Sequence, residues 1–316
     1  MGNGKRRKSF NRRDEAVLLR LGTFCSKKIK MITIFSCPKS FEGPAEIAQK
    51  NAIKSWLNLS PRCEIFLFGE DKGTAEIAKE FRIHHFPGVE KNEFGTPLFN
   101  SIFKIAQERA SNQILAYLNT DIILLNDFIP SLLKINLPLY LLTGRRFDLD
   151  VKELIDFTDR HWEKRLRKNI FEKGKLHGFS GIDYYVFPRN LKLQLPPFTV
   201  GRVGWDNWLF YQTKKSGIPI IDATPLITII HQNHSYPYKK KLSFKIETER
   251  NIKLAGGLSC MLTIREADFI LTKKGLERPK SLRWVFSRLA LFYPWRMIFL
   301  IKRKLQRLII NIFKNE

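Results

Sequence analysis

Cysteine is scarce in this sequence, which has four among 316 residues: Cys25, Cys37, Cys63 and Cys260. No two of them have the CxxC spacing of a zinc site, and no disulfide framework is implied, so a reducing cytosol fits the composition. Long apolar runs are also missing. No stretch reaches the roughly 20 apolar residues that a spanning helix needs, and no apolar run follows the basic residues 1–13, as a secretory signal would require.

Acidic residues are few as well. The sequence has 30 Asp and Glu against 55 Lys and Arg, which gives a formal net charge of +25. Residues 1–30 carry ten basic and two acidic residues, and residues 272–316 carry twelve and two, so only +7 remains for the long middle. The basic excess therefore belongs mainly to the ends and not to a groove in the core. This distribution, with no recognisable nucleic-acid motif, argues against a specific nucleic-acid partner.

Two catalytic signatures are not visible: a Ser or Cys nucleophile with a paired base, and a Walker-type Gly-x-x-x-x-Gly-Lys loop. A nucleotidyltransferase on a similar sheet would need a Gly-rich basic loop after the first strand, where this sequence has Ser-Cys-Pro-Lys at 36–39. The apolar fraction of 44% and the charged fraction of 27% are those of a globular protein. One large α/β domain with appended tails is the expected organisation.

The first eighty residues alternate between strand and helix signals. Residues 30–37 and 63–68 are short apolar runs typical of buried strands, and residues 44–56 and 74–81 have apolar residues at helical spacing. A β-α-β-α order predicts a parallel sheet with right-handed crossovers. The sequence therefore predicts an α/β fold.

The most informative stretch is residues 113–125. A buried strand at 114–118 ends in Asn119-Thr120-Asp121, and a second apolar run follows at 122–125. A carboxylate between two buried segments is costly unless it is paired or holds a metal, and the carboxyl end of a parallel strand is where open α/β sheets bind ligands. The alternative is that Asp121 only hydrogen-bonds the backbone of a turn.

This stretch resembles the Asp-x-Asp region of GT-A glycosyltransferases, in the superfamily of nucleotide-diphospho-sugar transferases. The resemblance implies a Rossmann-like, mixed, mostly parallel central sheet flanked by helices. It also implies a divalent cation, Mn²⁺ or Mg²⁺, held against the diphosphate of a sugar nucleotide. The sequence departs from the motif at its first position, which is Asn119, so Asp121 is the single charged ligand.

The resemblance assigns the ends of the first two strands to the nucleotide. Ser36, Cys37 and Pro38 would line one side of it, and Glu70 or Asp71 would bond the base. A polar turn is the alternative for these two acids.

The predicted helix at 98–110 has Thr96 as its expected N-cap and Pro97 at its first position. Its N-terminus would offer free N–H groups to an anion, so Thr96 is expected to contact the nucleotide, as are Asn119 and Thr120 beside the metal. We expect Arg145 and Arg146, after the predicted strand at 137–142, to be solvated surface rather than a phosphate grip.

A second block, residues 198–209, places two glycines just before a Trp-Asp-Asn-Trp helix start. Glycines allow close approach of a ligand to the backbone, and a carboxylate near a helix N-terminus is favourable. The block resembles the GT-A position where a carboxylate acts as general base on the acceptor hydroxyl, which makes Asp206 the expected base or acceptor anchor and Asp183 a second catalytic candidate. A cap is the alternative for Asp206. The expected acceptor residues, a platform for sugar, are Trp205, Asn207 and Trp208.

The last predicted core strand, at 226–230, ends in His231-Gln232-Asn233-His234. Neutral imidazole is a good divalent ligand beside a carboxylate, and in many members of the family that the chain resembles a histidine here completes the metal shell or touches the diphosphate. His231 or His234 is therefore expected to join Asp121 as a metal ligand.

The C-terminal tail combines an almost wholly apolar run at 289–301 with flanking Lys and Arg. It predicts a helix lying on an anionic membrane surface; a terminal helix packed on the core is the alternative. The expected domains are a basic arm at 1–29, a GT-A-like catalytic domain at 30–240, a helical extension at 241–280 and the membrane-surface tail at 281–316.

These observations predict a glycosyltransferase that moves a sugar from a nucleotide sugar to a hydroxyl of a glycan or lipid-linked acceptor. Its expected location is the cytoplasm, at the inner face of the membrane. One alternative is a catalytically degenerate protein of the same fold, because Asn119 replaces the first carboxylate. The other is a basic nucleic-acid-binding protein, which the net charge suggests.

Overall fold

The computed structural model describes residues 32–234 and 241–279. Its centre is a nine-stranded sheet in the order β13-β12-β10-β6-β9-β4-β1-β2-β3. Its strands are β1 (Ile32–Ser36), β2 (Glu64–Phe68), β3 (His84–Phe86), β4 (Ile114–Leu118), β6 (Leu141–Thr143), β9 (Tyr184–Pro188), β10 (Ile220–Asp222), β12 (Phe269–Thr272) and β13 (Gly275–Glu277). Strand β9 is antiparallel to β4 and β6, and β13 to β12, while the other neighbours are parallel.

The central strands form where the sequence is apolar without interruption. Ile34 of β1 pairs with Ile65 of β2 and with Ala116 of β4, and all three side chains are buried. A strand that is buried on both faces needs apolar residues on both faces, and this accounts for the unbroken runs. The predicted β-α-β-α start and the predicted mixed, mostly parallel sheet flanked by helices are confirmed.

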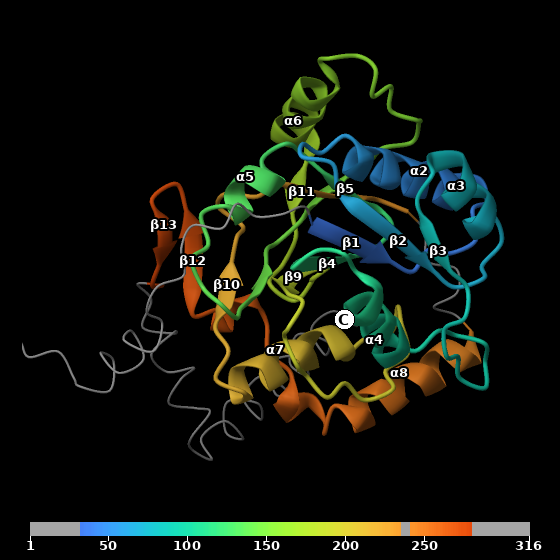
Figure 1. The fold of residues 1–316 in the computed structure, drawn as a ribbon, viewed down its shortest axis with the longest axis vertical. Helices are drawn as coiled ribbons and strands as arrows, with labels where there is room; N and C mark the ends of the chain where they lie inside the picture. The colour runs from blue at the N-terminus through green and yellow to red at the C-terminus, as the bar shows by residue number, and fades with distance from the viewer. Residues whose placement is uncertain (1–31, 235–240, 280–316) are drawn as a thin grey trace, which may run out of the picture.

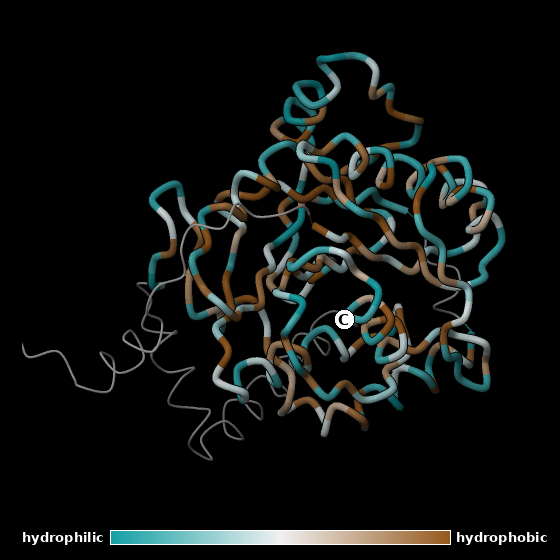
Figure 2. The backbone as a smooth tube through the Cα atoms, in the orientation of Figure 1, coloured by the Kyte–Doolittle hydropathy of each residue, from teal (hydrophilic) through white to brown (hydrophobic). Residues whose placement is uncertain are grey.

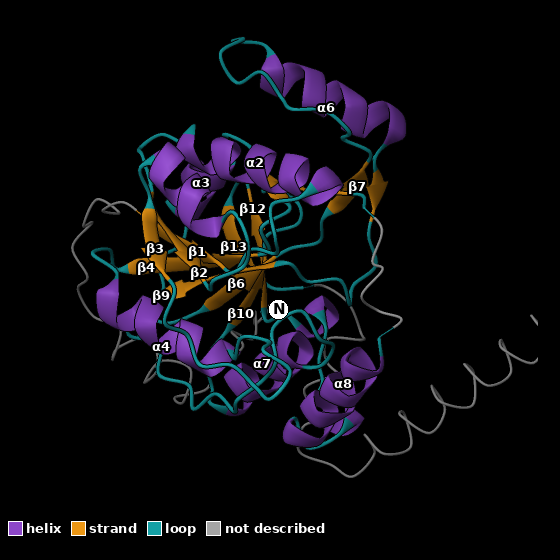
Figure 3. Ribbon diagram, turned by 90° about the vertical axis from the view of Figure 1, so that its right-hand side faces the viewer, coloured by secondary structure: helices purple, strands orange, loops and turns teal. Residues whose placement is uncertain are grey.

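Helices cover both faces of this sheet (Figures 1 and 3). Helices α2 (Gly43–Leu57) and α3 (Thr74–Phe81) lie on one face, and α4 (Phe99–Arg109) and α7 (Trp205–Lys215) lie on the other. Each face has its own apolar core, the first including Trp56 and the second Phe99. In Figure 2, hydrophobic residues are concentrated in the central strands.

A second, four-stranded sheet brings distant parts of the chain to one place. It has the order β5-β11-β7-β8, from β5 (Ile122–Leu124), β11 (Ile229–Gln232), β7 (Phe147–Leu149) and β8 (Lys175–Leu176). Because β5 follows β4 after a three-residue turn and pairs Ile122 with His231, that turn lies beside the end of β11. Helices α5 (Phe128–Leu132) and α6 (Trp162–Lys173) border this sheet, and α6 projects from the body (Figure 3).

Two expectations about local structure were wrong. Helix α4 begins at Phe99 with Leu98 as its N-cap, so Thr96 does not cap it. Thr96 and Pro97 instead lie in an extended segment, because Pro97 makes a bridge with Lys91 and Leu98 makes one with Thr199.

The segment 241–279 is not purely helical. It holds α8 (Leu242–Leu254), two short 3₁₀ turns (Leu258–Cys260 and Ile264–Glu266), and then β12 and β13, which extend the main sheet. The predicted arm at 1–29 and tail at 281–316 lie outside the described residues. Within residues 32–234 and 241–279, no helix is long and apolar enough to cross a membrane.

Candidate active site

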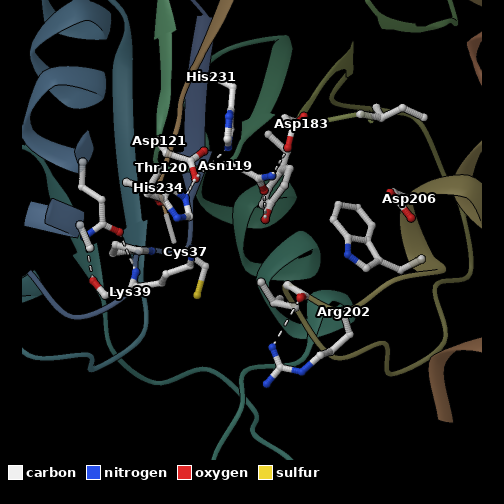
Figure 4. A pocket seen from close by; sticks show the side chains of 18 of the residues that line it. Cys37, Lys39, Asn119, Thr120, Asp121, Asp183, Arg202, Asp206, His231 and His234 are labelled. Carbon is white, nitrogen blue, oxygen red and sulfur yellow. Dashed lines mark hydrogen bonds and ion pairs between the residues drawn. The ribbon is translucent and has the colours of Figure 1, made fainter. Parts of the chain in front are cut away.

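A cavity of about 720 Å³ opens at the carboxyl ends of β1, β2 and β4, on the side where β11 ends. Figure 4 shows the side chains that line it. The predicted site residues on its wall are Cys37, Pro38, Asp71, Thr96, Asn119, Thr120, Asp121, Asp183, Trp205, Asp206, His231 and His234. Four of the predicted residues do not line it: Ser36, Glu70, Asn207 and Trp208. Most of the candidate site is therefore one cavity at the predicted edge of the sheet.

Asp121, His231 and His234 form a cluster in this cavity. Nε2 of His234 is 2.9 Å from Oδ2 of Asp121, and Nε2 of His231 is 3.7 Å from the same oxygen. One ligand atom from each residue lies within 4.8 Å of the other two. The structure thus places both candidate histidines beside Asp121, and their role as metal ligands stays a prediction.

The backbone around the cluster explains its geometry. The N–H of Ile122 donates to the C=O of Asn119 (3.1 Å), which closes the turn that exposes Asp121. The side chain of Gln232 then donates to the C=O of Asp121 (3.0 Å), which joins β11 to the turn. Ser36 supports the turn from below, because its Oγ is 2.6 Å from both Leu118 O and Thr120 Oγ1. Ser36 is thus a buried support and not a nucleotide contact.

The charges of the cluster suit a cation. Burial by itself would raise the pKa of Asp121, but the hydrogen bond with His234 and the nearby positive charges, including Lys39, outweigh it and lower that pKa. Burial lowers the pKa of His231, which favours the neutral imidazole that binds metals. Oδ1 of Asp121 is buried and accepts no hydrogen bond from the described residues. A carboxylate and two imidazoles fit a divalent cation, and nitrogen ligands suit Mn²⁺ better than Mg²⁺, which prefers oxygen.

The side of the cavity assigned to the nucleotide base is formed by Cys37, Pro38 and Asp71. Burial raises the pKa of the Cys37 thiol to about 12, so this thiol stays neutral. Burial also raises the pKa of Asp71, an effect that Lys91 partly offsets. Glu70 points elsewhere and forms an ion pair with Lys91. Of the two acids expected to contact the nucleotide base, only Asp71 lines the cavity.

The side assigned to the acceptor is formed by Trp205 and Asp206, at the start of α7. Oδ1 of Asp206 accepts the N–H groups of Gly204 (3.2 Å) and Asn207 (2.9 Å). Burial raises the pKa of Asp206 to about 6 in spite of these hydrogen bonds. A carboxyl group with such a pKa can exchange a proton near neutral pH, which is what a general base must do.

The predicted sugar platform is not formed as expected. Trp208 is buried against Phe198, with ring centroids 5.0 Å apart. The amide of Asn207 donates to the C=O of Leu262 (2.7 Å) and so ties α7 to the segment after α8. Trp205 lines the cavity, but its ring lies 4.1 Å from that of Phe99 and only 6% of the residue is exposed. Trp208 is therefore used for packing and Asn207 for a hydrogen bond, and neither residue lines the cavity.

Asp183 and Asn119 belong to a polar network in the cavity wall. The amide of Asn119 donates to Oδ1 of Asp183 (2.7 Å), and Arg146 forms ion pairs with Asp183 and Asp148. The expectation that Arg146 is solvated surface was wrong, because its side chain is only 13% exposed. Asp183 is accordingly a paired carboxylate that orients Asn119, not an available base.

Several lining residues escaped the sequence analysis: Gln49, Lys39, His177, Arg202 and Phe244. Lys39 follows the first strand, and its backbone is held by the side chain of Gln49 through bonds of 2.7 and 2.9 Å. Its place directly after a strand end was an available signal. His177 and Phe244 lie far along the chain in segments without a motif, so only the folded chain brings them to the cavity.

Comparison with known proteins gives distant structural matches. No protein-family model and no curated protein matches this sequence. A solved structure of glucosyl-3-phosphoglycerate synthase from Mycobacterium tuberculosis, in complex with Mn²⁺, UDP and phosphoglyceric acid, is 18% identical, covers 72% of this chain and 79% of that one, and has a TM-score of 0.44. A structure of GalNAc-T7 with UDP, GalNAc and Mn²⁺ is 15% identical, covers 72% of this chain and 48% of that one, and has a TM-score of 0.46.

A further structure of the mycobacterial synthase, with Mg²⁺ and UDP, is 15% identical, covers 79% of this chain and 85% of that one, and has a TM-score of 0.42. Because these matches are distant, the function of this chain has to be inferred from its own residues.

Proposed function

We propose that this chain is a glycosyltransferase that moves a sugar from a nucleotide-diphosphate sugar to an acceptor hydroxyl. The observation that carries the proposal is the cluster of Asp121, His231 and His234 in a cavity at the carboxyl ends of parallel strands. That edge is where open α/β sheets bind nucleotides. A buried carboxylate beside two histidines fits a divalent cation, and a cation there would serve the binding of a nucleotide diphosphate.

In this proposal, the residues on one side of the cavity bind the cation and the nucleotide, and those on the other side bind the acceptor. Asp121, His231 and His234 would hold Mn²⁺ or Mg²⁺, which when bound neutralises charge on the departing diphosphate. Lys39 lies close enough to lower the pKa of Asp121 and adds positive charge on this side. Cys37, Pro38 and Asp71 form the wall that would receive the base.

On the other side, Asp206 would anchor the acceptor hydroxyl or take its proton. Its pKa of about 6 means that it is ionised at neutral pH and can still accept a proton. Trp205, whose ring packs against Phe99, lines the cavity beside it. The acceptor we propose is a glycan or a lipid-linked glycan, and the transferred sugar a hexose or a related sugar.

The expected membrane association follows from the sequence of the tail. We propose that residues 281–316 hold the enzyme at an anionic membrane surface on the cytoplasmic side. Basic residues flanking an apolar run support this, since each Lys or Arg near such a surface contributes about 1 kcal/mol.

A thermal-shift screen with UDP-, GDP-, CMP- and dTDP-sugars, with and without Mn²⁺ or Mg²⁺, tests the proposed function. A ligand that binds only the folded state raises the melting temperature by mass action, by about 2.7 kcal/mol in free energy of unfolding at a hundredfold excess over Kd. We expect a shift with one nucleotide that requires the metal. No shift with any nucleotide would contradict the proposal and favour a catalytically degenerate protein.

A further inference from the structure

His177 is a cavity residue whose position is fixed on several sides. Its Nδ1 is 2.6 Å from Oδ2 of Asp148, and its backbone N–H donates to the C=O of Arg146 (2.9 Å). Its own C=O accepts Nε–H of Arg145 (2.7 Å). These bonds hold His177, which directly follows β8, against β7 and the two residues before it. The imidazole is therefore held in one orientation before any substrate binds.

The hydrogen-bond partner of Nδ1 also determines whether Nε2 carries a proton. A carboxylate such as Asp148 accepts hydrogen bonds, so Nδ1 carries the proton in the neutral ring and Nε2 carries a lone pair. In the described part of the chain, no residue hydrogen-bonds Nε2 of His177. The side chain is 35% exposed and lines the cavity. Nε2 is thus an oriented acceptor on the cavity wall.

Gly181 lies against this edge of the imidazole, where only a residue without a side chain fits. A Cβ at position 181 would lie 2.2 Å from Cδ2 and 2.6 Å from Nε2 of His177, closer than real contacts allow. Gly181 also lines the cavity. Any side chain at position 181 would displace the ring or cover Nε2. The absence of a side chain at Gly181 is therefore required for the position of His177 in the cavity wall.

Asp148 connects His177 to the proposed metal cluster. Its Oδ2 binds His177, while its Oδ1 is 3.4 Å from Nδ1 of His231 and 2.9 Å from Nε of Arg146. One carboxylate thus separates His177 from a proposed metal ligand. His177 and His231 both line the same cavity.

We propose that His177, oriented by Asp148, accepts the proton of the acceptor hydroxyl during transfer, an inference that rests on the proposed function. The acceptor O–H proton moves to Nε2 and the oxygen forms a bond to the anomeric carbon. The bond from that carbon to the diphosphate oxygen breaks, and its electron pair leaves with the nucleoside diphosphate. Asp206, which already uses Oδ1 for two backbone N–H groups, is then the acceptor anchor.

The first test needs no activity. Long-range ¹H–¹⁵N spectra of the histidine side chains, recorded at pH 8 on the full chain without metal or nucleotide, report which ring nitrogen is protonated. The His177→Gln variant assigns the signals. We expect the Nδ1–H tautomer for His177 and a change in its Nδ1 signal in Asp148→Asn. An Nε2–H tautomer would overturn the proposal, because Nε2 could not then accept a proton.

The second test measures release of nucleoside diphosphate with water as acceptor, using the nucleotide sugar and metal that the wild type binds. We expect His177→Gln to lower kcat by about 10²- to 10⁴-fold, the usual contribution of a general base, with the Kd for the nucleotide sugar within threefold of wild type. His161→Gln, an exposed histidine before α6, is the matched control and should keep full activity. In His177→Gly, added imidazole should restore part of the rate.

Two outcomes separate the hypotheses. If wild type binds a nucleotide sugar and His177→Gln turns it over at the wild-type rate, the role of His177 is overturned and the proposed function stands. If wild type binds no nucleotide sugar, the proposed function fails, and the role of His177 fails with it even where the spectra show the Nδ1–H tautomer.

Discussion

The carboxylate of Glu247 in helix α8 is completely buried and forms an ion pair with Arg202, which is 45 residues away at the edge of the cavity. Nε and Nη2 of Arg202 both lie 2.7 Å from Oε2 of Glu247. One turn further along α8, the side chain of Asn251 bonds both the N–H and the C=O of Thr199, at 2.9 and 3.0 Å. Helix α8 thus fixes the loop that leads into α7, and Asp206 lies in the first turn of α7.

Replacing Glu247 by alanine should therefore disturb both stability and the site. The change removes the carboxylate from a buried ion pair, and breaking such a pair from one side typically costs about 3–5 kcal/mol. We expect a loss of roughly that size in the free energy of unfolding, measured in urea. Glu249→Ala is the matched control, because Glu249 is exposed on the same helix and should change stability by less than about 0.5 kcal/mol. Equal losses in the two variants would contradict the role of the ion pair.

The raised pKa of Asp206 predicts a stability change that depends on pH. Burial raises this pKa to about 6 from about 3.9 in an unfolded chain, so the folded protein binds the proton more tightly. The tighter proton binding adds to the free energy of unfolding. This gain is fully present below about pH 4 and is lost as the pH rises through 6. Asp206→Asn resembles the protonated form, so we expect it to stabilise the protein at pH 8 by up to about 3 kcal/mol and to have little effect at pH 4.

Urea unfolding of wild type and Asp206→Asn at both pH values measures this difference. Other acids titrate equally in the two proteins and cancel in the comparison. The same gain at pH 4 and pH 8 would show that the effect is one of packing and not of charge.

Much of the fold and the cluster of Asp121, His231 and His234 could be predicted because their signals are local in the sequence. The apolar runs at β1, β2 and β4 needed no tertiary information. Asp121 was recognisable as a carboxylate at a strand end, and the two histidines as polar residues after a strand. The pairing of Ile122 with His231, which brings these residues together, follows once both segments are strands at one edge.

The residues that could not be predicted owe their places to contacts between distant segments. Arg146 was expected at the surface, yet it is held in the cavity wall by Asp148, two residues further on, and by Asp183, 37 residues away. Trp208 and Asn207 have the composition of a sugar platform, but the helical spacing of α7 turns them toward Phe198 and Leu262. Sequence patterns identify chemical types, whereas the direction of a side chain is settled by packing.

Deleting residues 281–316 should release the protein from anionic membranes. The tail carries the apolar run and much of the basic excess, and its Lys and Arg residues account for most of the expected attraction. Co-sedimentation with liposomes that contain phosphatidylserine, at physiological salt, measures the bound fraction. Liposomes of neutral lipid are the control and should bind neither form. Equal binding of the full and shortened chains to the anionic liposomes would show that the tail is not the anchor.

Replacing Asp121 by alanine should strongly weaken metal binding while the protein stays folded. The carboxylate lies within 4.8 Å of both histidine ligand atoms, and its removal leaves two imidazoles with no charged partner for a cation. We expect Mn²⁺ titration followed by calorimetry to show at least a tenfold weaker Kd, and the Mn²⁺-dependent rise in melting temperature to disappear. Asp71→Asn is the matched control, since Asp71 lines the same cavity outside the cluster and should bind Mn²⁺ as wild type does. Undiminished Mn²⁺ binding by Asp121→Ala would remove the cation from the site.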